Sequence, residues 1–311
     1  MLNIITGAIS LGLLWSTMAL GVYMSYRILD YADLTVEGSI ATGAVIAAKL
    51  IVSGTNPFTA TFAALLGGMA AGALTGLLNT KLKIPGILSG ILSMIALYSI
   101  NIRILGKANV TLLKSKTLFT MAAQIKLSVG VCGGIIALTC VFLLYKFLST
   151  SMGNAVRATG NNEQMSKAMG INTDGMKILG LAISNGLVAL SGALIAQNQC
   201  FADLQMGQGA IVIGLASVII SEVMFRGSTL IKRLFNVVLG AVAYRAIIAF
   251  VIEMGMNPLD LKLFTAITVA AALSLPKLKA WLYTTFVKRY SKVFHIKISR
   301  KSKQNVKEGL I

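Results

Sequence analysis

The chain has 311 residues, of which 56% are hydrophobic and only 12% are charged, whereas a soluble domain typically carries about 25% charged residues. This composition excludes an ordinary soluble domain and indicates an integral membrane protein. The formal net charge is +18, but ten Lys and Arg residues against one Glu fall within residues 276–311. Half of the excess charge therefore lies on one terminal segment, which is typical of a cytoplasmic end and not of a nucleic-acid-binding protein.

Nine apolar segments are long enough to cross a bilayer, which takes about 20 residues in a helix. The predicted spans are residues 4–26, 34–53, 58–80, 84–105, 127–148, 175–196, 209–225, 234–252 and 258–275. Pro57, Pro85 and Pro258 each fall at the start of a span, where a missing N–H costs nothing. We therefore expect an all-α polytopic integral membrane protein, with about nine transmembrane helices in a domain over residues 1–276.

The tail, residues 277–311, is predicted to be basic, amphipathic and cytoplasmic. Aromatic residues such as Trp281 are interspersed with basic ones such as Lys288, which suits a helix lying among anionic lipid headgroups; a solvated basic tail fits equally well. Counting the spans back from a cytoplasmic tail places residues 153–174 in the cytoplasm and the N-terminus outside. Residues 103–126 disagree, because they would be external although they hold five Lys or Arg residues.

Acidic residues mark the start of the second predicted span. Asp33 is placed as its N-cap, and Glu37 lies in its first turn, where a carboxylate complements the helix dipole. This pattern fits a plain helix start, and it also fits a shortened helix end that lines a cavity. Five polar residues within the predicted spans or directly before one are candidates for a translocation path: Asp33, Thr35, Glu37, Asn185 and Arg245.

Arg245 lies about 11 residues into the eighth predicted span, near mid-membrane, where a charge is costly and must face protein or water. We expect it to form a structural ion pair, and the candidate partners are Glu222, Glu253 and Asp203. Contact with an anionic group of a substrate is the alternative.

The sequence carries no pattern for catalysis or metal binding. Its single histidine, His295, lies in the tail, and Cys132, Cys140 and Cys200 do not have the spacing of metal ligands. A phosphate-binding GxxxxGKS/T motif is absent as well. We therefore expect no catalytic residue, no metal site and no cofactor on this chain.

Glycines recur at four-residue spacing in the third predicted span, at Gly68, Gly72 and Gly76. Such a ridge lets helix backbones approach each other closely in lipid. A packing role is favoured over a role in transport.

The longest polar run inside the apolar chain covers residues 153–177. Asn161 is placed as an N-cap with Gln164 as its capping-box partner, and Gly170 suits a left-handed helix end. These signals predict a short cytoplasmic helix over residues 162–169, between the fifth and sixth spans. A rigid docking helix and an ordinary loop helix both fit this pattern.

Four stretches of the chain carry a family resemblance: GNNEQMSKAMGINTDGMKILGLAISNGLVALSGAL, YRILDYADLTVEGSIATGA, SGILSMIALYSINIRILGKANV and NPLDLKLFTAITVAAALSLPKLK. The first resembles the cytoplasmic coupling region of bacterial ABC-importer permeases of the branched-chain amino acid and ribose type. The second resembles the first-to-second-span signature of that family. The last two are similar to its subgroup of tryptophan/tyrosine (aromatic amino acid) permeases. The resemblance covers residues 10–280, which is most of the chain.

This resemblance implies a permease subunit that forms the translocation path for a small solute, with an aromatic or branched-chain amino acid as the expected substrate. It implies a second permease copy, cytoplasmic ATPase subunits that bind the ATP, an extracytoplasmic substrate-binding protein and the lipids of the bacterial cytoplasmic membrane, with no nucleic acid. Residues 161–170 would dock in a groove of the ATPase. The coupling residues are then Gly160, Asn161, Asn162, Glu163, Met165, Ala168, Gly170 and Ile171.

Two other classes of membrane protein stay open on the residues alone. A self-sufficient secondary transporter or channel would also lack a nucleotide motif, and so would a structural or assembly protein. The capped cytoplasmic helix favours the ABC permease, because a separate ATPase needs a rigid docking surface. The scarcity of acids within the spans weighs against a proton-coupled carrier, which needs titratable groups.

Overall fold

The computed structural model describes residues 2–225, 227, 229–253, 263–264, 266–267, 270 and 274. Nearly all of the described secondary structure is helical, which confirms an all-α polytopic architecture. The ninth predicted span, residues 258–275, is described at only six of its positions. The predicted tail and the domain boundary at residue 276 lie outside the described residues.

Seven helices of the described part of the chain are long and apolar enough to cross a membrane. They are α1 (Leu2–Val22) with its π-helical continuation η1 (Tyr23–Ile28), α2 (Thr35–Val52), α3 (Pro57–Thr80), α4 (Gly86–Leu105), α6 (Val129–Leu148), α9 (Thr173–Gln199) and α11 (Leu230–Glu253). They match the first six predicted spans and the eighth, with ends shifted by a few residues. At the start of α3, the Asn56 side chain accepts a hydrogen bond from the Phe58 N–H at 3.0 Å.

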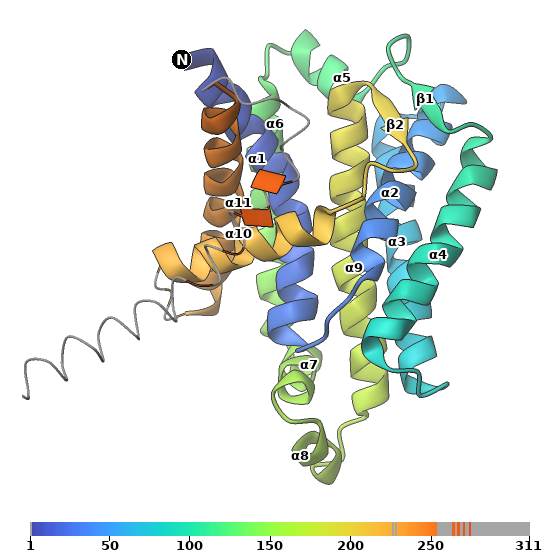
Figure 1. Ribbon diagram of the computed structural model, residues 1–311, viewed down its shortest axis with the longest axis vertical. Helices are drawn as coiled ribbons and strands as arrows, with labels where there is room; N and C mark the ends of the chain where they lie inside the picture. Colours follow the sequence, from blue (N-terminus) through green and yellow to red (C-terminus); the bar gives the residue numbers. More distant parts are fainter. Residues whose placement is uncertain are drawn as a thin grey trace, which may run out of the picture. The chain divides into compact units, whose positions relative to one another are not determined.

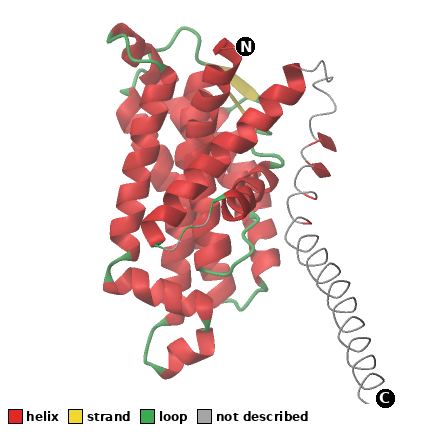
Figure 2. Ribbon diagram, turned by 90° about the vertical axis from the view of Figure 1, so that its left-hand side faces the viewer, coloured by secondary structure: helices red, strands yellow, loops and turns green. Residues whose placement is uncertain are grey.

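The seventh predicted span corresponds to a shorter helix, α10 (Ala210–Met224), of 15 residues. Such a helix is about 22 Å long, whereas the hydrocarbon core of a bilayer is about 30 Å thick. Figures 1 and 2 show α10 lying across the long helices rather than along them. The prediction of nine full spans is therefore not confirmed, because the described residues hold seven long helices and this transverse one.

The two ends of the bundle carry different connections. A two-stranded antiparallel ribbon, β1 (Asn109–Thr111) with β2 (Phe201–Asp203), and the short helix α5 (Leu118–Gln124) lie at the same end as the N-terminus (Figure 1). The short helices α7 (Ser151–Asn161) and α8 (Glu163–Ala168) lie at the opposite end. The polar run of residues 153–177 is thus separated from the ribbon by the full length of the bundle.

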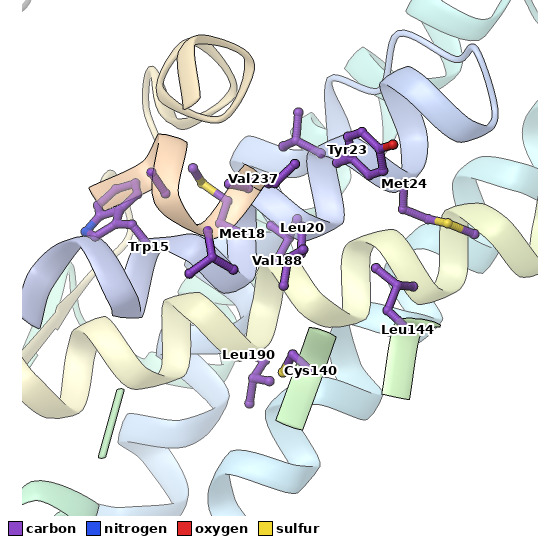
Figure 3. Packing of buried hydrophobic residues seen from close by; sticks show 14 of the residues in the cluster. Trp15, Met18, Leu20, Tyr23, Met24, Cys140, Leu144, Val188, Leu190 and Val237 are labelled. Carbon is purple, nitrogen blue, oxygen red and sulfur yellow. The ribbon is translucent and has the colours of Figure 1, made fainter. Parts of the chain in front are cut away.

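Helix α9 packs at the centre, against α1, α2 and α3. Figure 3 shows Val188 and Leu190 of α9 among Met18 and Leu20 of α1 and Cys140 of α6, all of them buried. Small polar side chains of α9 bind the backbone of α1 within this core. The Ser184 hydroxyl donates to the Gly21 carbonyl at 2.8 Å, and the Ser191 hydroxyl donates to the Leu14 carbonyl at 2.9 Å.

The glycine ridge of α3 packs directly on the backbone of α9. A Cβ atom at Gly68 would collide with the Asn185 carbonyl oxygen, and one at Gly72 would collide with the Leu181 carbonyl oxygen. This contact confirms the packing role that the four-residue spacing predicts.

Gly72→Ala is expected to destabilise the bundle, because the new methyl group meets backbone that cannot rotate away. Overpacking of this kind costs about 1–3 kcal/mol. The measurement is the thermal stability of the detergent-purified protein. Gly134→Ala on α6 is the matched control, since its Cβ would meet only Leu13 Cδ1 at 3.8 Å. Equal stability of the two variants would contradict the packing role.

Candidate functional site

The chain enters α2 from inside the helix bundle. Residues 29–34 run back from the end of η1 and bring the start of α2 beside the middle of α9 (Figure 1). There, Asp33 Oδ2 accepts a hydrogen bond from Asn185 Nδ2 at 2.6 Å. The first turn of α2 therefore lies at the depth of a central residue of α9, which supports the shortened helix end over a plain helix start at the membrane surface.

Asp33 is the centre of a buried polar network, with only 2% of its surface exposed. Its Oδ1 accepts a hydrogen bond from the Thr35 N–H at 2.9 Å, so it caps α2 although Leu34 holds the N-cap position of the backbone. The Asn185 Oδ1 atom accepts a hydrogen bond from the Ser39 hydroxyl at 2.6 Å. The Asn185 amide thus joins Asp33 to the second turn of α2.

Buried hydroxyl groups extend this network to α3 and α4. The hydroxyl oxygens of Thr35 and Thr75 lie 2.8 Å apart, and the Thr75 hydroxyl donates to Ser93 Oγ at 2.8 Å. A buried polar group without a partner costs about 1–3 kcal/mol, so these satisfied groups favour one arrangement of the four helices. We interpret Asp33, Thr35 and Asn185 as the scaffold that positions the start of α2.

Glu37, one half-turn beyond Thr35, faces a different environment. Its Oε1 accepts a hydrogen bond from the Gly209 N–H at 2.9 Å, which ties α2 to the residue before α10. Glu37 also lines a cavity of about 460 Å³. The other residues that line this cavity come from α2, α4 and the segment after β2: Gly38, Ala41, Met94, Ile95, Tyr98, Asn101, Leu204, Gln205 and Gln208.

Sequence reasoning missed most of this cavity. Asn101 is a polar residue within the fourth predicted span and could have been singled out for the same reason as Arg245. Tyr98 and Met94 look like ordinary membrane-helix residues, and Gln205 is placed beside α2 and α4 only by the fold.

The expected ion pair of Arg245 is wrong. Glu222 pairs instead with Arg27, whose Nε lies 2.8 Å from Glu222 Oε1. The Arg245 guanidinium lies over the Trp15 ring of α1, 4.0 Å from its centroid, and makes no ion pair with any described residue. Cation–π stacking stabilises a charge without a carboxylate, but the buried Nε atom of Arg245 has no hydrogen-bond partner among the described residues. The structure thus does not bring Arg245 together with the other four path candidates.

The coupling segment, residues 151–170, consists of two short helices, α7 and α8, rather than one (Figure 1). Asn161 is the last residue of α7, so its placement as the N-cap is wrong. Asn162 has an extended backbone between the helices, and its side chain accepts a hydrogen bond from the Met165 N–H at 2.9 Å. Helix α7 continues to Asn161 and leaves the cap to the next asparagine, so the Asn161–Gln164 capping box does not form.

The end of α8 follows the prediction. Gly170 has a φ of +79°, a left-handed conformation that favours glycine. The Ile171 N–H donates to the Ser166 carbonyl at 3.0 Å and the Gly170 N–H to the Lys167 carbonyl at 3.0 Å, which is a Schellman motif. Asn172 then caps α9 by accepting a hydrogen bond from the Gly175 N–H at 3.1 Å.

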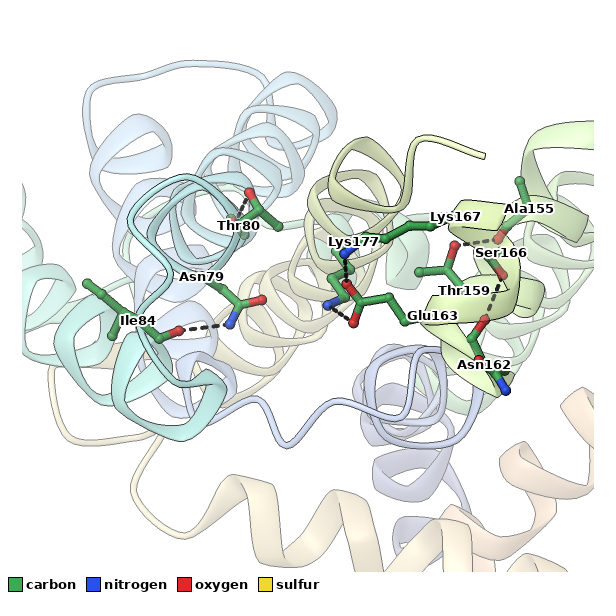
Figure 4. Close-up of polar contacts among 11 residues, drawn as sticks. Asn79, Thr80, Ile84, Ala155, Thr159, Asn162, Glu163, Ser166, Lys167 and Lys177 are labelled. Carbon is green, nitrogen blue, oxygen red and sulfur yellow. Dashed lines mark hydrogen bonds and ion pairs between the residues drawn. The ribbon is translucent and has the colours of Figure 1, made fainter. Parts of the chain in front are cut away.

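Glu163 holds α8 against α9. Its two carboxylate oxygens accept hydrogen bonds from Lys167 at 2.8 Å and from Lys177 at 2.6 Å (Figure 4). These bonds hold the pKa of the Glu163 carboxyl below its ordinary value. The outer face of α8 is left exposed, with Met165 58% and Met169 69% exposed and Ala168 exposed between them.

Glu163→Gln is expected to loosen α8 by less than about 1 kcal/mol, because the ion pairs are partly exposed. Since folding lowers the pKa of this carboxyl, its stabilisation is present above its ordinary pKa and is lost as the pH falls through the folded-state value. Hydrogen–deuterium exchange of residues 163–169 should therefore be faster in the variant at pH 7, and equal to wild type in acid below that value. Gln164→Ala serves as the control. Equal exchange at pH 7 would contradict a stabilising pair.

Comparison with known proteins agrees with this architecture. Residues 4–272 match the family described as branched-chain amino acid transport system / permease component. A tyrosine transport system permease protein of Clostridioides difficile is 44% identical over 281 residues, which cover 90% of this chain and 94% of that protein. The autoinducer 2 import system permease protein LsrC of Escherichia coli is 27% identical over 210 residues, 67% of this chain and 60% of that one.

A solved inward-facing structure of an ABC transporter assigned to the metal-chelate type superposes with a TM-score of 0.51 at 15% identity, covering 89% of this chain and 85% of that one. At this identity the likeness concerns the fold alone. The family match extends over nearly all of the described helices. The chain therefore belongs to the branched-chain amino acid transport system permease family and is a permease component of an ABC importer.

Proposed function

We propose that this permease imports tyrosine or a closely related aromatic amino acid. The observation that carries the proposal is the 44% identity, over 90% of the chain, to a permease described as part of a tyrosine transport system. The stretch resembling aromatic amino acid permeases, residues 89–110, belongs to α4 and β1 and includes Tyr98 and Asn101 of the cavity. The substrate assignment and the cavity thus involve the same helix.

We also propose that ATP is bound and hydrolysed on a separate cytoplasmic ATPase that docks on α7 and α8. An exposed apolar face with both helix ends capped suits a groove in a partner, because the caps keep the helix rigid. On this assignment, α7 and α8 face the cytoplasm of a bacterium, and the C-terminal tail lies on the same side. The substrate-binding protein then meets the opposite end, and a second permease copy completes the path.

Uptake by proteoliposomes tests this assignment. The permease is reconstituted with its ATPase and its substrate-binding protein, and labelled tyrosine is supplied with the binding protein on the outside. Uptake should require ATP inside, and unlabelled tyrosine, phenylalanine or tryptophan should compete better than leucine.

Two results would overturn parts of the proposal. Uptake by the permease alone, without ATPase or ATP, would indicate a secondary transporter or channel. ATP-dependent uptake of another solute, with no uptake of any aromatic amino acid, would leave the importer assignment intact and exclude the substrate.

A further inference from the structure

Asn101 places a buried hydrogen-bond acceptor at the cavity between α2 and α4. Only 1% of this residue is exposed, and its Oδ1 atom has no hydrogen-bond partner among the described residues. Asn101 and Glu37 both line the same cavity of about 460 Å³. A buried acceptor without a donor is unfavourable, so Oδ1 marks a point where the donor of a ligand would be stabilised.

The polar groups of this cavity favour a cation that carries several N–H donors. Glu37 supplies a carboxylate whose Oε1 is held by the Gly209 N–H, which leaves Oε2 for a second donor. Gln205 and Gln208 add side-chain amides. Within the described residues, no Lys, Arg or His lines the cavity. A primary ammonium group therefore suits it better than a carboxylate or a phosphate.

The remaining wall suits an aromatic ring. Met94, Ile95 and Tyr98 of α4 line it, and Tyr98 is 49% exposed, so its ring is open to contact. Thioether and aromatic side chains both pack favourably on aromatic rings. The volume also falls within the range of about 300–1,000 Å³ that small-molecule sites occupy. The cavity thus places an acidic group and an aromatic wall within reach of one small molecule.

We propose that this cavity binds the transported amino acid through its ammonium group, with Glu37 and Asn101 as the ammonium ligands and Met94 and Tyr98 against the side-chain ring. The inference rests on the proposed aromatic substrate and adds the residues of this chain that contact it. Glu37 lies close to Asp33 in the sequence, but its side chain accepts a hydrogen bond from Gly209 and not from the network around Asp33. The inference gives this carboxylate a separate role.

Ligand binding to the intact permease–ATPase complex tests the inference. The complex is studied in lipid nanodiscs without its binding protein, so that the selectivity of the binding protein does not contribute. Labelled tyrosine is competed with tyramine, which keeps the ammonium group but lacks the carboxylate. It is also competed with 3-(4-hydroxyphenyl)propionate, which keeps the carboxylate but lacks the ammonium group. Tyramine should compete at least about 10-fold better, because a donor-requiring site rejects a ligand without the donor.

Substitutions of Glu37 and Asn101 provide a second test of the inference. Glu37→Gln and Asn101→Leu should each weaken tyrosine binding about 10-fold or more, whereas Asn101→Asp should retain it, because a carboxylate also accepts from an ammonium group. Glu253→Gln makes the same chemical change as Glu37→Gln at an exposed position on α11 and should bind like wild type. If Glu37→Gln fails to fold, Asn101→Leu against Asn101→Asp decides the point.

Failure of this inference can be told apart from failure of the proposed substrate. If the wild-type importer transports no aromatic amino acid, the proposed substrate is excluded, whatever result the variants give. A wild-type importer that transports tyrosine, while Glu37→Gln and Asn101→Leu both bind and transport like wild type, would show that the cavity is not the site. Equal competition by tyramine and 3-(4-hydroxyphenyl)propionate would show that the ammonium group is not recognised there.

Discussion

Met165→Asp is expected to abolish assembly of the permease with its ATPase. Met165 is 58% exposed on α8, and a flexible thioether side chain suits an apolar groove. A carboxylate at this position would be buried without a partner in the complex, which costs about 3 kcal/mol, or a factor of about 100 in affinity. Membrane insertion should be unchanged, because the side chain is on the surface of the isolated chain.

Co-purification of the ATPase with a tagged permease measures this effect, together with ATP-dependent uptake in vesicles. Met165→Leu is the control, because it keeps the apolar character and nearly the volume of the side chain and should assemble like wild type. If Met165→Asp assembles and transports normally, α8 is an ordinary loop helix, and the ATPase docks elsewhere.

The coupling segment shows how far local sequence signals reach. The left-handed end at Gly170 was predictable, because it depends on backbone conformation within a few residues. Asn161 and Asn162 are equally good caps by residue type, so the sequence offers no reason to prefer the second. The choice follows from the length of α7, whose last turn packs on η1, a contact between residues more than a hundred positions apart.

The membrane helices also show which features the sequence predicts and which depend on the fold. Hydropathy located the long helices, because a span needs a long apolar run whatever surrounds it. Hydropathy did not distinguish the transverse α10 from a span, because a helix lying inside a protein is as apolar as one facing lipid. The β1–β2 ribbon was missed because each strand has three residues, too few to show a periodic pattern.

The polar residues of the site were predictable as a set but not as an arrangement. Asp33, Thr35 and Asn185 were all among the predicted path residues, and the structure brings these three together. The stacking of Arg245 on Trp15 could not be predicted, since an aromatic partner leaves no charge pattern in the sequence. Pairing across the bundle depends on which faces of α2, α4 and α9 meet, and only the fold determines that.

Gly160→Val is expected to uncouple ATP hydrolysis from transport while leaving the ATPase bound. A Cβ atom at Gly160 would collide with the Ile28 carbonyl oxygen and lie 2.8 Å from Leu29 Cα. Both contacts are with backbone, so a change of rotamer cannot relieve them, and overpacking of this kind costs about 1–3 kcal/mol. The end of α7 must then move away from the point where η1 leads into residues 29–34.

The contact between the end of α7 and the end of η1 connects the coupling segment to the start of α2, because residues 29–34 lead from η1 to the Asp33 network. A shift of α8 in the ATPase groove should reach Asp33 through this contact, since packed backbone transmits displacement. In Gly160→Val the contact is lost, whereas the exposed face of α8 is unchanged. Co-purification should therefore be normal, with uptake at least about 10-fold lower and ATP hydrolysis retained, an effect comparable to a lost interaction of about 1.4 kcal/mol or more.

The ratio of tyrosine taken up to ATP hydrolysed is the decisive measurement, because it separates uncoupling from loss of assembly. Gly134→Val is the matched control, since its Cβ would lie in ordinary contact with the tip of Leu13 and the ratio should stay at the wild-type value. A wild-type ratio in Gly160→Val would show that the α7–η1 contact does not transmit the motion of the ATPase. Loss of both assembly and hydrolysis would show that α7 positions α8 for docking instead.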